Sequence, residues 1–170
     1  MRFFDLVCFQ DESVADTGVR LGFRKVFVSG RDVGVVEEYK SGQKYRQIIR
    51  SDDIGRISKA LRQGDVIGMM PQSSSVSRKT LDTIMSNEKA LFLPLRWVTC
   101  SDRTARIQNL AKARTSVRNA LVARVPISIV SMAESGDELI SSLQMIEVAG
   151  FLGLERERAK SALSLLGGLL

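Results

Sequence analysis

Basic side chains are concentrated in one part of the sequence. Residues 96–125 contain seven lysines and arginines and a single acidic residue, Asp102, whereas the rest of the chain has 18 basic and 18 acidic residues. The net charge of +6 therefore lies in this stretch. Clustered guanidinium and ammonium groups attract phosphates, so the pattern predicts an anionic partner. The basic residues are Arg96, Arg103, Arg106, Lys112, Arg114, Arg118 and Arg124.

Acid/base and metal chemistry have few candidate residues. The chain has no histidine, which excludes Ser-His-Asp and Cys-His catalysis and histidine-ligated zinc. Asp11, Asp52, Asp53 and Glu155 lie near expected strand ends, and we interpret Asp52 and Asp53 as helix caps. We therefore expect no catalytic residue and no metal ligand in this chain.

Asp5 and Arg96 are the two single residues with the strongest expectations. Alternation along the first strand directs Asp5 inward, and a buried carboxylate needs a partner, for which Arg96 and Arg50 are candidates. An interior ion pair is favoured over a catalytic role for Asp5. Arg96 follows an apolar strand, where it can either form a salt bridge to the scaffold or bind a phosphate. The sequence leaves both roles of Arg96 open.

Short apolar runs alternate with amphipathic segments along the chain. Strands are expected at 3–9, 25–29, 45–50, 66–70, 91–95, 127–131 and 151–154. Helices are expected at 12–21, 51–64, around 81–85, at 102–123, at 136–150 and around 159–166, while 31–45 follows no single period. Strands separated by single helices pair in parallel through right-handed crossovers. A doubly wound sheet and a reduced barrel both fit, but both glycine-rich nucleotide-binding motifs are absent, which favours the barrel.

The predicted architecture is thus α/β, a reduced TIM-like (β/α) barrel of about seven parallel strands in one domain, residues 1–170.

Basic and apolar residues overlap on the long helix at 102–123, so either arginine stems cover apolar surface or the helix breaks near Thr115. Cys8 and Cys100 are expected to be buried, small hydrophobic residues. The sequence contains neither a targeting pattern nor a membrane-spanning apolar run, so a cytoplasmic protein without membrane contact is expected.

Several segments resemble a known family when they are taken in order. They are residues 3–6 (FFDL), 66–68 (VIG), 92–96 (FLPLR), the helix at 106–121, 129–133 (IVSMA) and 146–154 (IEVAGFLGL). In sequence and spacing they resemble ribonuclease P protein component 3, the archaeal and eukaryal barrel subunit of a ribonucleoprotein that processes tRNA. The chain departs from the family by a shorter segment at 31–50, by Trp97 in place of a proline, and by Met132 after the sixth strand.

The resemblance implies a TIM-like barrel of the kind found in a metal-dependent phosphoesterase superfamily (PHP), with the metal site lost. It also implies partnership with ribonuclease P RNA, with protein component 2 and other holoenzyme proteins, and indirectly with precursor tRNA. On this interpretation the RNA removes the 5′ leader of precursor tRNA with Mg²⁺, and the protein itself binds no cofactor and is non-catalytic. Charge and strand-end position indicate the residues that contact RNA: Arg31, Arg50, Arg96, Arg103 and Arg106.

Two other functions remain open from the sequence. One is a stand-alone barrel phosphoesterase or lyase that acts on a small phosphorylated substrate through Asp5 or Arg96. The other is a purely structural partner protein, for which replacing Arg96 or Arg106 leaves RNA affinity unchanged.

Overall fold

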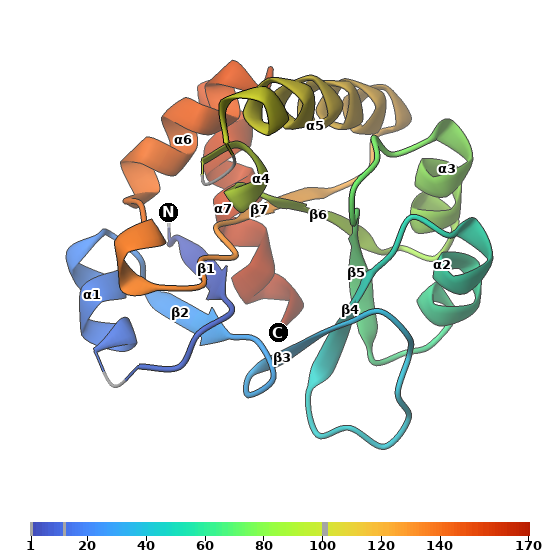
Figure 1. Ribbon diagram of the computed structural model, residues 1–170. Helices are drawn as coiled ribbons and strands as arrows, with labels where there is room; N and C mark the ends of the chain where they lie inside the picture. Colours follow the sequence, from blue (N-terminus) through green and yellow to red (C-terminus); the bar gives the residue numbers. More distant parts are fainter. Residues whose placement is uncertain (1, 12, 100–101) are drawn as a thin grey trace.

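Strands and helices alternate in a computed structural model of the chain, which describes residues 2–11, 13–99 and 102–170 (Figure 1). The strands are β1 (Phe4–Val7), β2 (Lys25–Val28), β3 (Val33–Val36), β4 (Arg46–Arg50), β5 (Val66–Met70), β6 (Ala90–Pro94) and β7 (Ile127–Val130). The helices are α1 (Val14–Arg20), α2 (Ile54–Leu61), α3 (Arg78–Ser86), α4 (Arg96–Thr99), α5 (Arg103–Ala123), the 3₁₀ turn η1 (Gly136–Glu138), α6 (Ser142–Phe151) and α7 (Arg156–Leu169).

All strand pairs in these ranges are parallel, and they form two sheets. β1 pairs with β2, and the second sheet has the order β3-β4-β5-β6-β7. Backbone bonds link the sheets at one seam, where Met132 N–H donates to the Leu6 carbonyl (2.9 Å) and Cys8 N–H donates to the Ala133 carbonyl (2.8 Å). At the other seam a bridge joins Ser29 to Val33. The predicted α/β class with parallel strands is confirmed.

The strands are buried on both faces, as is usual for parallel sheets. Alternate residues enter two separate apolar clusters: Phe92 lies in one, whereas its neighbours Leu91 and Leu93 lie in the other. The larger cluster includes residues of the covering helices. The smaller one gathers residues from each strand from β1 to β7, and Leu166 of α7 packs into it. The two-sided burial explains why the strands read as continuous apolar runs.

Local caps determine several helix boundaries. Asp53 accepts from the backbone N–H groups of Gly55 (2.7 Å) and Arg56 (3.1 Å), so it caps α2 as predicted. Asp52 has a different role, since its carboxylate accepts bonds from the loop at 72–74. Asp102 caps α5 through the backbone N–H groups at 104 and 105. α5 runs unbroken from Arg103 to Ala123, so of the two alternatives left open by the sequence the break near Thr115 does not occur.

Three other expectations at the carboxyl-terminal half are wrong. The run at 151–154 is not a strand, because Phe151 ends α6 and Gly153 turns the chain with a φ of +99°. α6 begins at Ser142 rather than at 136, since Ser141 and Gln144 form a reciprocal capping box. The last helix does not stop before Gly167 but continues through it, and the Phe4 ring occupies the place where a side chain at 167 would lie.

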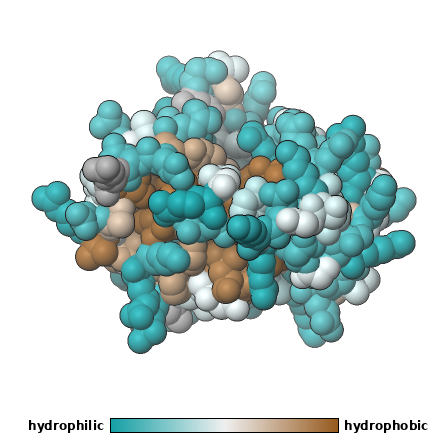
Figure 2. Space-filling model, turned by 90° about the horizontal axis from the view of Figure 1, so that it is seen from below, coloured by the Kyte–Doolittle hydropathy of each residue, from teal (hydrophilic) through white to brown (hydrophobic). Residues whose placement is uncertain are grey.

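The segment with no predicted structure, 31–45, contains β3 but no helix. Tyr45 covers β3 by lying against Gly34. Figure 2 looks onto the molecule from the side of β3 and the β3–β4 connection, and apolar side chains gather near the middle of this face within a hydrophilic surround.

No helix among the described residues is long and apolar enough to cross a membrane.

Candidate anion-binding site at the carboxyl ends of the strands

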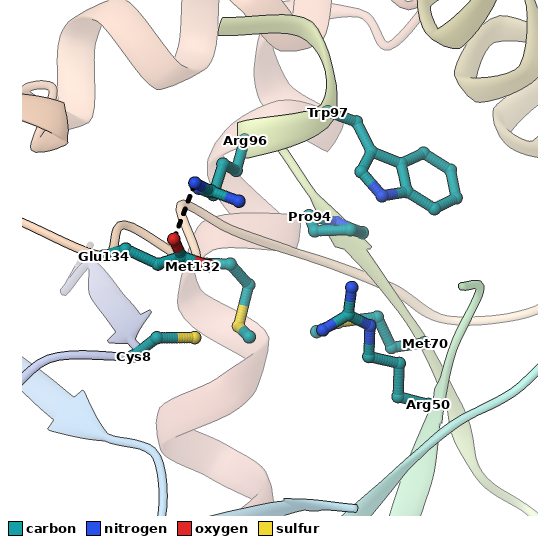
Figure 3. A pocket seen from close by; sticks show the side chains of 8 residues that line it. All are labelled: Cys8, Arg50, Met70, Pro94, Arg96, Trp97, Met132 and Glu134. Carbon is teal, nitrogen blue, oxygen red and sulfur yellow. Dashed lines mark ion pairs between the residues drawn. The ribbon is translucent and has the colours of Figure 1, made fainter. Parts of the chain in front are cut away.

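Residues that follow or end five of the strands enclose a pocket of about 240 Å³ (Figure 3). Ligands of parallel α/β folds bind at this end of the strands. The pocket is lined by Cys8 after β1, Arg50 and Met70 at the ends of β4 and β5, Pro94 at the end of β6, Arg96 and Trp97 of α4, and Met132 and Glu134 after β7. Two guanidinium groups and one carboxylate are its charged members.

Arg96 is held by two carboxylates. Its Nη2 lies 2.7 Å from Glu134 Oε2, and its Nε donates to Glu138 Oε2 at 3.1 Å. Glu138 is itself fixed, because its Oε2 also accepts the Glu134 backbone N–H (2.8 Å). The side chain of Arg96 is 39% exposed, so it remains accessible from the pocket. Of the two roles left open by the sequence, the scaffold salt bridge is therefore present in this structure.

Arg50 enters the pocket from the opposite side. It is the last residue of β4, is exposed, and its guanidinium points across the pocket toward α4 (Figure 3). Register pairs Arg50 with Met70, which forms the neighbouring wall. The strand holds the backbone of Arg50, while its side chain extends to where a ligand would lie. An anion in the pocket would meet Arg50 on one side and the edge of the Arg96 guanidinium on the other.

The Cys8 thiol is influenced by both the acidic and the basic side chains of the pocket. Partial desolvation by the pocket walls and then the Glu134 carboxylate raise the pKa of its thiol, while Arg50 and Arg96 act in the opposite direction. The prediction that Cys8 is buried is wrong, because Cys8 follows the end of β1 and is exposed at the pocket mouth. Cys100 lies outside the described residues. The direction of this pKa shift is opposite to the one that activates a cysteine nucleophile.

Asp5 is fully buried beneath this end of the fold, as the alternation predicted, but its partners differ from those expected. Its Oδ1 accepts the backbone N–H groups of Ser131 (2.7 Å) and Leu6 (2.8 Å), and Oδ2 has no partner among the described residues. Within the same residues no ion pair joins Asp5 to Arg96 or Arg50. Burial raises the pKa of Asp5 to about 6, and hydrogen bonds from Ser131 and Leu6 offset only part of this rise.

The bond from Ser131 to Asp5 helps to position the pocket. It crosses the seam between β1 and β7, beside the bond from Met132 N–H to the Leu6 carbonyl. Met132 itself adopts a positive φ of +55°, which is uncommon outside glycine and turns the chain into the pocket wall. Asp5 is therefore placed to hold the ends of β1 and β7 together, directly beside the wall that Met132 forms.

The other predicted contact residues lie outside the pocket lining. Arg31 follows β2 and is ion-paired with Asp32 at 2.9 Å. Arg103 and Arg106 are exposed on the first turns of α5, which Asn109 ties to the pocket rim by a bond from its Nδ2 to the Trp97 carbonyl (3.1 Å). The structure thus brings Arg50 and Arg96 together at one pocket, and the other three arginines are not part of its lining.

Sequence reasoning missed the acidic side of the site. Glu134 and Glu138 lie four residues apart just after β7, and neither was counted among the carboxylates near strand ends. Their spacing on a short loop after a strand is a signal that could have indicated a pair of partners for a basic residue. In the described part of the chain, no group of three or more Cys, Asp or Glu side chains is arranged to hold a metal ion.

Comparison with protein-family models finds no matching family, and comparison with curated proteins finds no relative. Comparison with solved structures finds similarity to a chain in a cryo-EM structure of archaeal ribonuclease P with mature tRNA. The TM-score is 0.70 at 13% sequence identity, and the match covers 98% of this chain and 79% of that chain. At this identity the likeness shows a shared fold, which extends over nearly all of the present chain.

Proposed function

We propose that this chain is the component 3 type of protein subunit of ribonuclease P. In this role it binds the catalytic RNA and assists removal of the 5′ leader from precursor tRNA, while the RNA performs the cleavage with Mg²⁺. The observation that carries the proposal is the fold likeness over 98% of the chain to a chain of an archaeal ribonuclease P complex. The ordered sequence motifs and the basic excess at residues 96–125 support it independently.

The same proposal includes barrel closure and the partners. The two sheets would act as one barrel, joined at the seams between β7 and β1 and between β2 and β3. The RNA is the principal partner, and protein component 2 and the other holoenzyme proteins are further partners. Arg31, Arg50, Arg96, Arg103 and Arg106 are the proposed RNA contacts. Arg50 has the strongest structural case among them, since its side chain points into the pocket.

Reconstitution tests the proposal. Ribonuclease P RNA and the other protein components are mixed with and without this chain, and precursor-tRNA cleavage is measured as Mg²⁺ is varied. We expect the chain to raise the cleavage rate or to lower the Mg²⁺ requirement, because a basic protein stabilises folded RNA by neutralising phosphates. An unchanged rate at every Mg²⁺ concentration would exclude the proposed role.

Salt dependence gives a second prediction. The logarithm of the RNA association constant should fall linearly with the logarithm of salt concentration, by about 0.7 to 0.9 for each phosphate contacted. Contacts from all the proposed arginines would give a slope of about −4. Filter binding or fluorescence anisotropy over a range of KCl concentrations measures it. A flat salt response would argue for a purely structural partner protein instead.

The Arg50→Ala variant tests the pocket itself. We expect roughly a tenfold loss of RNA affinity and a salt slope shallower by about 1, since one phosphate contact is removed. Arg62→Ala is the matched control, because Arg62 is an exposed arginine at the end of α2, away from the pocket. Equal losses in both variants would show that the effect follows net charge rather than the site.

The pocket also favours a second candidate, a stand-alone barrel enzyme for a small phosphorylated substrate. Its volume of about 240 Å³ is slightly below that of usual ligand pockets and fits only a small molecule, whose phosphate Arg50 and Arg96 could bind. Turnover of generic phosphate esters by the purified chain would support this alternative if it disappeared in Arg96→Ala. The absence of such turnover together with activity in reconstitution would favour the RNA-binding role.

A further inference from the structure

A groove runs along the outer side of α5, separate from the strand-end pocket. One hollow of about 320 Å³ lies between α5 and the turn after α6, with Arg114, Arg118, Leu121 and Leu152 in its lining. A second hollow of about 230 Å³ continues from it toward α7. Leu121 lines both hollows, so they adjoin.

The floor of this groove is apolar and its rim is basic. Leucines from α5, α7 and the turn after α6 form the floor, and three arginines flank it. All three arginines are exposed, and none of them makes an ion pair with a described residue. α5 contains basic residues and no acidic one, so nothing on the helix itself neutralises this charge. The floor consists of Leu121, Leu152, Leu154 and Leu165, and the rim of Arg114, Arg118 and Arg158.

Three exposed apolar residues lie near the groove. Phe151, next to Leu152, is 73% exposed, and Val122, next to Leu121, is 69% exposed. Ile107, two turns before Arg114 on the same face of α5, is 65% exposed. Single exposed apolar residues are ordinary and none of these three lines either hollow, but Phe151 and Val122 each follow or precede a lining residue and add exposed apolar surface beside the groove. The sequence offered two explanations for apolar residues among the arginines of α5: arginine stems that cover them, or a break in the helix. Neither explains the exposure of Ile107 and Val122, because α5 is continuous and both side chains face water.

We propose that this groove binds an acidic amphipathic helix of a partner protein. Leucine-type side chains on one face of that helix would cover Leu121 and Leu165, and carboxylates on its flanks would pair with Arg114, Arg118 and Arg158. This is the helix-in-groove mode, in which residues at i, i+3, i+4 and i+7 anchor the ligand. Charge complementarity indicates that the partner helix is acidic, because three guanidinium groups repel a basic helix and attract an acidic one.

A protein partner is favoured over RNA by the chemistry of the floor. Phosphates would satisfy the arginines but would leave the accessible parts of Leu121 and Leu165, and the exposed Val122, in water. Bases stack on aromatic platforms, and apart from Phe151 beside the groove the surface offers none, because the lining itself is aliphatic. An amphipathic helix satisfies both parts of the surface at once. The inference does not depend on the proposed role in ribonuclease P, since it uses only the shape and charge of this groove.

A synthetic helical peptide of about four turns provides the probe. It carries leucines along one face and glutamates on both flanks, and a companion peptide replaces each glutamate with lysine. Binding to the full chain is measured by fluorescence anisotropy. We expect saturable binding of the acidic peptide only, with methyl NMR shifts at Leu121 and Leu165. Arg118→Glu should weaken it by about tenfold or more, because an attraction becomes a repulsion.

Matched controls separate this groove from general charge effects. Lys79→Glu makes the same charge change at an exposed position on α3, and it should leave peptide affinity unchanged. Phe151→Ser should weaken binding, whereas Val19→Ser, at a similarly exposed position on α1, should not. Equal binding of the acidic and basic peptides, or an unchanged affinity in Arg118→Glu, would overturn the proposal.

Two further outcomes would replace the proposed occupant with another one. If a single-stranded RNA of about 20 nucleotides loses affinity in Arg118→Glu while the acidic peptide does not bind, the face is an RNA surface. If the chain self-associates in sedimentation and Phe151→Ser abolishes this, the groove is covered by a second copy. Failure of the reconstitution experiment above would leave all of these measurements unaffected, so the two proposals can fail separately.

Discussion

Replacing Gly68 with alanine should destabilise the protein by about 3 kcal/mol, a large part of the total stability of a domain of this size. Gly68 lies in the middle of β5 and is the register partner of Ala90 on β6. A Cβ at Gly68 would meet the Ala90 carbonyl oxygen and would lie 2.7 Å from the nearest ring atom of Phe92. Phe92 is fully buried and the Ala90 oxygen belongs to the backbone, so neither can move without distorting the core.

The expected consequence extends to the pocket. Met70, two residues after Gly68, and Pro94, two residues after Phe92, both line it, so separating β5 from β6 moves two of its walls. Urea unfolding followed by circular dichroism measures the loss of stability. Gly64→Ala is the control, since a Cβ at Gly64 meets nothing within 4 Å, and it should change stability by no more than about 0.5 kcal/mol. Equal unfolding midpoints for the two variants would contradict the close approach of β5 and β6.

The parts of the fold that can be predicted from the sequence are those governed by local patterns. Buried strands such as β5 and β6 read as apolar runs, and the caps Asp53 and Asp102 precede their helices. β3 escapes prediction because its residues follow no period and include Gly34, which has no side chain and lies under Tyr45. The run at 151–154 resembles a strand because an apolar helix end that leads into a glycine turn has the same composition.

The sequence predicts where the site lies but not which residues bind Asp5 and Arg96. The direction of Asp5 follows from alternation on one strand, which is local. Its partners are backbone N–H groups, one of them 126 residues away, and every residue except proline offers such a donor. From side-chain types alone, an arginine is the expected ion-pair partner of Asp5. In the structure Arg96, one of the two candidates, is instead paired with Glu134 and Glu138. Long-range pairing depends on which strand ends meet, which the sequence alone does not specify.

Asp5→Asn should remove a pH dependence of stability of roughly 3 kcal/mol, which is the free energy equivalent of a pKa difference between 3.8 and about 6. The folded state holds the Asp5 proton more tightly than the unfolded state does. Between about pH 4 and pH 6 the unfolded chain has therefore released this proton while the folded chain retains it. Asp5 consequently lowers stability progressively as the pH rises through this window, and the loss is complete above the folded-state pKa. Asparagine does not titrate, so its contribution is constant.

The substitution also preserves the geometry that matters. In Asp5→Asn the amide oxygen can replace Oδ1 as the acceptor for the backbone N–H groups of Ser131 and Leu6. The NH₂ group then takes the place of Oδ2, which has no partner among the described residues. The hydrogen bonds across the seam between β1 and β7 therefore stay in place, and the pH effect is isolated from a loss of packing.

Urea unfolding of the wild type and of Asp5→Asn at intervals from about pH 4 to pH 7 measures the effect, and the difference between the two proteins carries the signal. Carboxylates with lowered pKa values, such as Asp52, titrate at lower pH and contribute equally to both proteins, so they cancel. Relative to the wild type, Asp5→Asn should gain stability from about pH 4 to pH 6 and then stay level.

Asp11→Asn is the matched control, because Asp11 is exposed and its lowered pKa places its titration below the window. Its stability relative to the wild type should show no trend above about pH 5. A constant difference between the wild type and Asp5→Asn across the window would mean that Asp5 titrates normally. Its carboxylate would then be hydrated rather than sealed between β1 and β7, because only desolvation in that seam raises its pKa.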